Sequence, residues 1–357
     1  MVSADNPICV IGIGACTAVG LNADSTAAAI RAGISGFDEH PYMINQEGEP
    51  YVLATVPSIE PAIMGNKRYS ALALPALQEA LSPLQQLPSQ KYEISAVIGL
   101  PEQRPGLPEN LQQSLIADIK ALHGGYYAIN EIQVSFRGHA AGLIALESAS
   151  QQLQTGKNLF CIAGGIDSYI DPDTLDWVED NEQLHIPSNA WGFIPGEASA
   201  FCLLSTEETA NRLGLPIKAK LLSISTAQEK NKIKTETVCI GEGLTTAINT
   251  VAQALPDKMK INQTYCDQNG EAYRADEFGF MLTRLSEYFK DPSEYLAPAD
   301  CWGDVGAASG PLFINQLCAA AEKGYGLGEV SLLWTSSEGG DRSAAIFVTG
   351  GSQRRSM

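Results

Sequence analysis

The chain has 357 residues, enough for one large α/β domain or two fused halves, and its content of 45% hydrophobic and 18% charged residues is that of a globular protein. Its formal net charge of −18 argues against nucleic acid as a partner, because no basic excess exists to neutralise phosphates. No apolar run is long enough to span a bilayer, and no basic stretch precedes the first apolar run, so we expect a cytoplasmic protein without a signal peptide.

The first half of the chain alternates between predicted strands and helices. It begins with a buried strand and a Gly-rich turn, followed by a helix for which Asn22 or Asp24 is a candidate N-cap. The sharpest turn holds Gly138 and His139 and precedes a long buried helix. In chain order, the predicted elements are a strand in 7–20, helices in 22–33 and 68–84, a strand in 93–102, a helix in 109–124, a helix over His139–Leu153, a strand over Leu159–Gly164, a strand in 191–205 and a helix in 206–214.

A second cycle of strands and helices follows. Its predicted elements are a strand in 215–227, a helix in 241–256, a mixed stretch in 261–289, a Gly/Ala-rich turn in 301–310 and strands in 329–337 and 343–351. The alternation predicts parallel sheets covered on both faces. "RGHAAG" and "GDVGAASG" both place small residues where a helix starts, which permits close packing between the halves. We therefore expect two similar halves, 1–210 and 211–357, without a flexible linker.

The basic clusters and the eight cysteines indicate no binding motif. We interpret the basic clusters as solvated surface: Lys67-Arg68, Lys230/Lys232/Lys234 and Arg354-Arg355. No C-x-x-C pair is present, so neither a zinc site nor a redox motif is supported. Cys9, Cys161 and Cys202 lie in apolar, strand-like runs, which predicts buried and reduced cysteines.

Five segments, in the right order, resemble the β-ketoacyl synthases of the thiolase superfamily over nearly the whole chain. They are "VIGIGACTAVGLNADSTAAAIRAGISGF", "HAAGLIALESASQQLQTGKNLFCIAGGID", "NAWGFIPGEASAFCLLS", "GDVGAASG" and "EGGDRSAAIFV". They match, respectively, the N-terminal strand and helix, the nucleophile helix with its following strand, a Gly-rich turn and strand, a second Gly-rich turn, and the C-terminal strand. The resemblance implies a five-layered αβαβα fold of two similar halves, usually a homodimer. No cofactor is expected.

The resemblance also implies a catalytic cysteine at a helix N-terminus and two histidines, and all three positions have changed type. A helix dipole and local amides activate such a cysteine and stabilise the oxyanion. The nucleophile position matches His139, and the first histidine position matches Gln268 or Asp267. The second matches Gly303 or Asp304. Four histidines exist in the chain: His40, His123, His139 and His185. We therefore expect no condensing reaction.

Two interpretations of His139 stay open. A helix N-terminus disfavours positive charge, so we expect a neutral imidazole there. It either fills the former pocket as a hydrogen-bonded side chain, which we favour, or faces Asp267, Asp304 or Glu271 in a repurposed site for general-base chemistry. A metal site built from one histidine and several aspartates lacks the usual ligand spacing.

The polar segment "DQNGEAYRADE" and two tryptophans complete the candidate site. We expect the segment to be a surface turn, with a rebuilt pocket rim or a partner-docking loop as the alternative, and its Glu271 and Arg274 are spaced to pair. Trp302 and Trp191 flank equivalent turns, and we expect them to plug the former acyl channel.

The sequence thus predicts a catalytically silent β-ketoacyl-synthase-like protein that acts as a binding, scaffold or accessory factor for a protein partner. The "DxNGExYR" and "GDxGAASG" stretches also resemble thiolase-like proteins of type VI secretion effector loci, which implies an effector-loading or adaptor role. Acyl carrier proteins are acidic, so a chain of charge −18 repels them at long range. The alternatives are an acyltransferase of the β-ketoacyl synthase type, with an unrecognised nucleophile or an active partner subunit, and a pocket with hydrolytic or lyase chemistry centred on His139.

Overall fold

Ten strands pair into one hydrogen-bonded ladder whose two halves repeat the same strand order. The computed structural model describes residues 6–87, 92–122, 127–233, 235 and 237–350, so Lys234, Gly351 and the Arg354-Arg355 cluster lie outside the described residues. The strands of the first half are β1 (Ile8–Thr17), β4 (Tyr92–Leu100), β5 (Tyr127–Phe136), β6 (Phe160–Ser168) and β7 (Glu197–Thr206). Those of the second half are β8 (Ala219–Gln228), β9 (Gln263–Cys266), β10 (Tyr295–Leu296), β11 (Val330–Ser336) and β12 (Asp341–Val348).

The repeat extends to strand direction. The order runs β5-β4-β6-β7-β1 in the first half and β10-β9-β11-β12-β8 in the second, and the halves join where β1 pairs with β8 over Ile8–Val10. In each half the first and last strands pair antiparallel, and the two outermost pairs are parallel. The prediction of parallel sheets is therefore wrong for β1, β7, β8 and β12. Each of these strands pairs with antiparallel neighbours, and an antiparallel pair needs no crossover helix between its strands.

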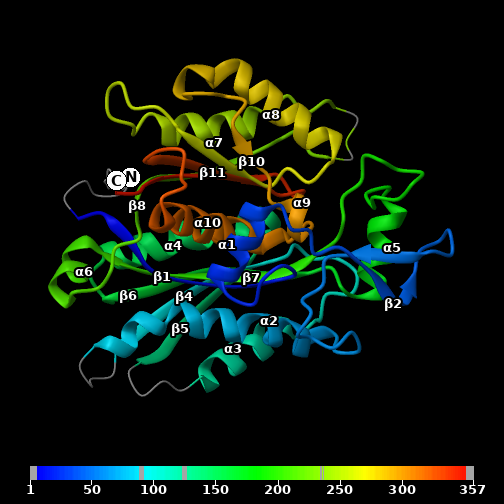
Figure 1. Cartoon of the computed structure of the whole chain (residues 1–357), viewed down its shortest axis with the longest axis horizontal. Coiled ribbons are helices and arrows are strands. Elements are labelled where there is room, and N and C mark those ends of the chain that lie inside the picture. Colours follow the sequence, from blue (N-terminus) through cyan, green and yellow to red (C-terminus); the bar gives the residue numbers. More distant parts are fainter. Residues whose placement is uncertain (1–5, 88–91, 123–126, 234, 236, 351–357) are drawn as a thin grey trace.

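Helices cover both outer faces and fill the space between the two halves of the ladder (Figure 1). On one outer face lie α2 (Gly65–Ala80) and α3 (Leu111–Ala121), and on the other lie α7 (Glu242–Ala252) and α8 (Ala272–Leu285). Between the halves lie α1 (Ala23–Ala32), α4 (Ala141–Gln154) and α10 (Ser309–Lys323). Three apolar cores lie between these layers, and the arrangement confirms the five-layered αβαβα fold. The domain boundary at residue 210 stays a prediction.

The remaining elements lie at the edges of the layers. They are the hairpin of β2 (Asp38–Ile44) and β3 (Pro50–Leu53), helices α5 (Pro172–Asp180), α6 (Glu207–Leu213) and α9 (Ala299–Trp302), and single 3-10 turns at Ser82–Gln86, Gly138–Ala140, Ser286–Tyr288 and Gly306–Ala308. The hairpin and α5 have no counterpart among the elements predicted from the sequence. Within the described residues, no helix is long and apolar enough to cross a membrane.

Several local predictions are confirmed and one is wrong. The side chain of Asn22 caps α1, accepting the Ser25 amide at 2.8 Å. The cysteines carry free thiols, and all but the partly buried Cys239 are buried. Arg68, interpreted above as solvated surface, is 1% exposed and bonds both carboxylate oxygens of Glu197, because burial of its charge requires an acidic partner.

Candidate functional site

The candidate site is built on two equivalent turns that lead from an outer strand into a middle-layer helix. In the first half, the 3-10 turn Gly138–Ala140 leads into α4, and in the second half, Gly306–Ala308 leads into α10. Each turn opens on a glycine with positive φ, +62° at Gly138 and +45° at Gly306, a conformation that favours glycine over other residues. The Ala140 amide donates to the Ser337 hydroxyl at 2.8 Å, so the loop after β11 holds the first turn in place.

His139 lies at the start of α4 and contacts Asp304 from the other half. The side chain of His139 is 5% exposed, and its Nε2 lies 2.8 and 2.9 Å from the two carboxylate oxygens of Asp304. Asp304 also accepts hydrogen bonds from the Gly306 amide at 2.9 Å and from the Asn269 side chain at 2.6 Å. Asp304 is therefore hydrogen-bonded to three residues, His139, Asn269 and Gly306.

Arg274, at the start of α8, completes what we call the buried charge cluster: His139, Asp267, Glu271, Arg274 and Asp304. The guanidinium of Arg274 is 1% exposed and lies 3.0 Å from Asp267 and 3.2 Å from Glu271. It also donates to the Ser336 carbonyl at 2.9 Å. Its third nitrogen lies 3.2 Å from His139 Nε2. The predicted pairing of Glu271 with Arg274 is confirmed.

The cluster favours the charged forms of both His139 and Asp304. Burial alone lowers the pKa of His139 and the neighbouring Arg274 lowers it further, but the charge and hydrogen bond of Asp304 outweigh both and raise it above its ordinary value. For Asp304, burial raises the pKa, but the charges of His139 and Arg274 and the bonds from His139 and Asn269 hold it well below its usual range. The contact with Asp304 therefore favours the imidazolium form more than the helix N-terminus by itself predicts.

The other matched positions lie outside the cluster. Gln268 donates its amide to the Arg274 carbonyl at 3.2 Å, so it contacts the backbone of α8. Gly303 has a φ of +74°, and a Cβ there would lie 2.8 Å from the Ile194 carbonyl. At both positions the neighbouring aspartate, Asp267 or Asp304, supplies the side chain that reaches the cluster.

Two further expectations are corrected. The segment "DQNGEAYRADE" is not a surface turn, since Asp267, Glu271 and Arg274 are each at least 95% buried. Trp302 is 1% exposed and lines the cavity beside Asp304, as a plug does, whereas Trp191 is 70% exposed and plugs nothing. Tight packing of α9 against the second turn buries Trp302, while Trp191 lies in an irregular loop.

Little free space remains beside the cluster. The cavity that Asp267, Trp302 and Asp304 line measures about 10 Å³, which is the space of a single water. On the surface side, an open hollow of about 200 Å³ reaches Asp304 between Phe37, His185 and Asp300.

The cysteines offer no activated nucleophile. Burial raises the pKa of every cysteine thiol, to about 11 at Cys161 and Cys239 and to about 12 at Cys9, Cys16 and Cys318. The pKa values of Cys202, Cys266 and Cys301 are also raised, again mainly by burial. A thiolate is the nucleophilic form, so these thiols are held in the unreactive state.

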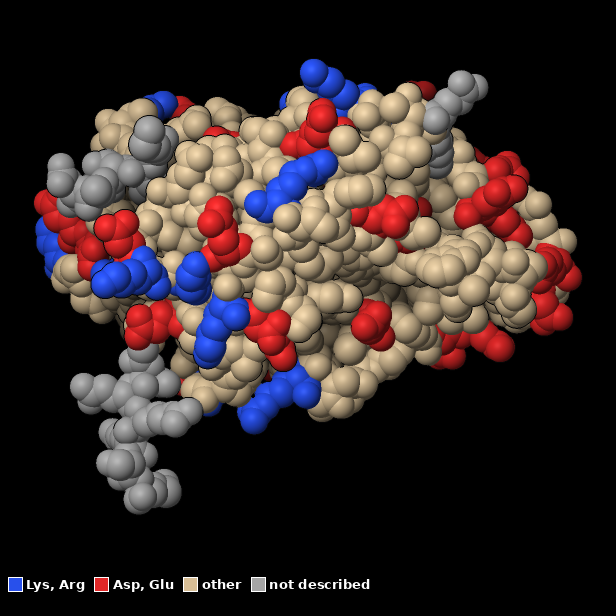
Figure 2. Space-filling model, turned by 90° about the horizontal axis from the view of Figure 1, so that it is seen from above, with Lys and Arg blue, Asp and Glu red and all other residues tan. Residues whose placement is uncertain are grey.

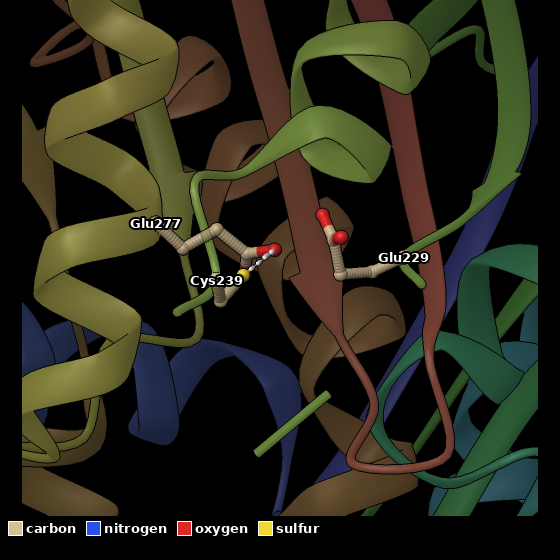
Figure 3. A group of neighbouring side chains, drawn as sticks. All are labelled: Glu229, Cys239 and Glu277. Carbon is tan, nitrogen blue, oxygen red and sulfur yellow. Dashed lines mark hydrogen bonds between the residues drawn. The ribbon is translucent and has the colours of Figure 1, made fainter. Parts of the chain in front are cut away.

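One group of possible metal ligands lies apart from the cluster, near the loop that follows β8 (Figure 3). The ligand atoms of Glu229, Cys239 and Glu277 lie within 4.8 Å of one another. Glu229 already accepts the amides of Asn231 and Gly243, and Glu277 accepts from Ser336 and from the Arg342 guanidinium at 2.6 Å. Each of the four carboxylate oxygens therefore already accepts a hydrogen bond within the fold.

Comparison with solved structures identifies the architecture. A complex of a type II polyketide ketosynthase with its acyl-carrier protein matches with a TM-score of 0.77 and 16% identity, over 97% of this chain and 99% of the other. The ketosynthase from module 6 of the bacillaene synthase of Bacillus subtilis matches with a TM-score of 0.74 and 12% identity, over 97% of this chain and 72% of the other. The chain has the ketosynthase fold.

The ishigamide ketosynthase/chain length factor shares the ketosynthase fold with a TM-score of 0.68 and 19% identity, over 97% of this chain and the whole of the other. No protein-family model matches the chain, and no curated protein is detectably similar to it in sequence. The resemblance drawn from short motifs is therefore confirmed at the level of the fold.

The role of Arg274 exceeds what its spacing from Glu271 predicts. Arg274 bridges Asp267 and Glu271 and also reaches His139. The sequence signal for this role is an isolated basic residue within an acidic segment that follows a strand. Gln183, which donates to Glu271 at 2.9 Å from the loop after α5, has no such signal.

Proposed function

We propose that this chain is a catalytically silent relative of the β-ketoacyl synthases that acts as a binding, scaffold or accessory factor. The observation that carries the proposal is the buried charge cluster, in which the His139 imidazole occupies the start of α4 and is paired with Asp304 at 2.8 Å. A condensing enzyme needs a nucleophile at this place. Here the position holds an imidazole that is paired with a carboxylate, and fold alone brings no activity with it.

The geometry also argues against a new activity at His139. A general base must have a free lone pair within reach of a substrate proton. The Nε2 atom of His139 contacts Asp304 and Arg274, and the adjoining cavity has room for about one water. Hydrolytic or lyase chemistry at His139 is therefore disfavoured.

An accessory role of this kind requires partners. We propose an effector-loading or adaptor role, in line with the resemblance to thiolase-like proteins of type VI secretion loci, and a homodimer. Strand β5 supports the dimer, because it is the outer edge of the ladder and its residues Asn130, Glu131 and Gln133 are exposed. An exposed strand edge offers unpaired backbone groups to a second chain.

The test is incubation of the folded protein with acyl-thioester substrates, followed by intact-mass measurement. We expect no covalent acyl adduct on the native protein. The matched control is the protein unfolded in urea, whose thiols are free to react and show that the reagent is competent. A stoichiometric adduct on the native chain would overturn the proposal and would favour an acyltransferase with an unrecognised nucleophile, which peptide mapping would locate.

A further inference from the structure

The β2–β3 hairpin and α5 form an end of the molecule that carries charge of one sign only. Residues 38–53 include four acidic residues and residues 172–191 include five, and neither segment contains a lysine or an arginine. The two segments are far apart in the chain, yet they lie together at one end of the fold (Figure 1). We call this the acidic end and define it as residues 38–53, which hold β2 and β3, together with α5 and residues 181–191.

Direct contacts hold the two segments together. The amide of Gln46 donates to Glu179 at 3.0 Å, and the hydroxyl of Tyr51 donates to the same carboxylate at 2.7 Å. From the loop that follows α5, the hydroxyl of Ser188 donates to Glu47 at 2.6 Å. Each contact is a neutral donor to a carboxylate, so none of them cancels a negative charge.

The charge of the acidic end is not neutralised within the described residues. The exposed carboxylates of the hairpin and of the α5 region have no ion pair with lysine or arginine there; they are Asp38, Glu39, Glu47, Glu49, Asp173, Asp176, Asp180 and Glu182. Seen from above, red side chains gather at this end without blue ones beside them (Figure 2). Like charges held together at one place cost free energy, which a partner of opposite charge recovers.

The acidic end also exposes large apolar side chains. Tyr42 is 75% exposed, Ile44 is 63% exposed and Trp191 is 70% exposed. Tyr42 and Ile44 lie on the outer side of β2, and no other element of the described chain covers this face of the hairpin. Exposed apolar groups rimmed by charge are typical of protein interaction sites, where aromatic residues act as anchors.

A hollow of about 510 Å³ lies between the hairpin and the loop that follows α5. Its lining includes Glu47, Glu179 and Glu182, and also the apolar residues Leu184 and Ile186. A lining with both apolar and acidic side chains suits a lysine or arginine side chain, whose stem is apolar and whose head is cationic.

We propose that the acidic end is the docking surface for a protein partner, through a segment of that partner in which basic residues alternate with large apolar ones. This inference rests on the proposed binding role and names the chemistry of the partner. Phosphate backbones and anionic membranes carry the same sign of charge as this surface and are repelled by it. A basic, apolar segment matches both the charge and the exposed side chains.

The test measures binding of a fluorescein-labelled amphipathic peptide of lysine and leucine by anisotropy, with a counterpart that has glutamate in place of lysine. We expect the basic peptide to bind with one-to-one stoichiometry, the acidic one not to bind, and binding to weaken as NaCl rises to about 0.5 M. Two variants should each raise the Kd by about tenfold or more: Glu47→Gln with Glu179→Gln and Glu182→Gln, and Tyr42→Ala with Trp191→Ala.

The matched control removes equal charge elsewhere, through Glu287→Gln, Asp291→Asn and Glu294→Gln, and should leave the Kd nearly unchanged. Equal weakening by the control, or no weakening by either acidic-end variant, would overturn the proposal. It would also be overturned if the wild-type chain formed a dimer that Tyr42→Ala with Trp191→Ala dissolved, since the face would then be a self-interface. An acyl adduct in the mass experiment with peptide binding intact would remove the silent function alone.

Discussion

Asp304 is the residue that connects the two halves of the fold at the buried charge cluster. It is hydrogen-bonded to His139, Asn269 and the Gly306 amide, and thereby ties the turn before α4 to the turn before α10. Its negative charge also acts on the buried Arg274, and burying an uncompensated charge is costly. Asp304 is thus a clasp between the two halves.

Replacing Asp304 should therefore damage stability far more than replacing an exposed aspartate nearby. For Asp304→Ala we expect the free energy of unfolding to fall by about 3–5 kcal/mol, because His139 loses its hydrogen-bond partner and Arg274 loses a nearby negative charge. Urea unfolding followed by tryptophan fluorescence measures this change. The control is Asp300→Ala, an exposed residue beside the same hollow, which should change stability by about 0.5 kcal/mol or less. A similar decrease in the free energy of unfolding in both variants would contradict this role of Asp304.

The raised pKa of His139 makes part of the stability depend on pH. An unfolded histidine titrates near about 6.5, so the contribution of a histidine with a raised folded pKa is fully present below that pH. It is lost as the pH rises through the folded pKa. We expect the stability difference between wild type and His139→Gln to shrink as the pH rises from about 6 to about 8, measured by urea unfolding. A difference that stays constant or grows would show that the imidazole is neutral in the folded protein.

At the scale of elements, β5 is the edge strand on which the proposed homodimer depends. One edge of β5 pairs with β4, and the other faces out of the ladder. Exposed residues on this strand are polar, with Glu131 as the charged one. In a symmetric dimer built on this edge, each residue of β5 would lie near the same strand of the second chain.

Added charge on β5 should weaken such a dimer. For Gln133→Lys combined with Ser135→Lys, we expect the dimer Kd to rise by about tenfold or more, because four new cations meet at one interface. Sedimentation velocity over a range of protein concentrations measures this shift. Asn211→Lys on the exposed side of α6 is the control and should leave association unchanged. A monomeric wild type, or a dimer indifferent to the β5 charges, would contradict the proposed homodimer.

At the scale of the whole molecule, the net charge of −18 acts against the compact state. Repulsion between exposed carboxylates is screened by salt, whereas the buried pairs of Arg68, Arg274 and Arg342 are screened much less. We expect the Tm to rise by about 2–4 °C when NaCl is raised from about 20 mM to about 200 mM, measured by calorimetry. KCl should have the same effect at equal ionic strength. A falling Tm would mean that exposed ion pairs outweigh the repulsion.

Patterns in the sequence are enough to predict the class of fold. Alternating apolar strands and helices, with small residues at Gly138, Gly142, Gly306 and Gly310, indicate two similar halves, because such patterns arise from local geometry and close packing. The motifs also place His139 at the position for which the resemblance implies a cysteine. The hairpin and α5 escaped detection because Pro41 and Pro50 interrupt the alternation of the strands and acidic residues dominate the short helix.

The contacts of His139, Arg274 and Asp304 follow from the tertiary structure. Asp304 and His139 are 165 positions apart, and Arg274 reaches His139 from α8, so no local spacing reveals that the three share one buried site. The raised pKa of His139 follows from that meeting, since burial lowers it but the charge and hydrogen bond of Asp304 at 2.8 Å raise it. The acidic end likewise exists because two segments that lack basic residues fold against each other. Charge sums along a sequence are local, whereas fields and ion pairs act through space.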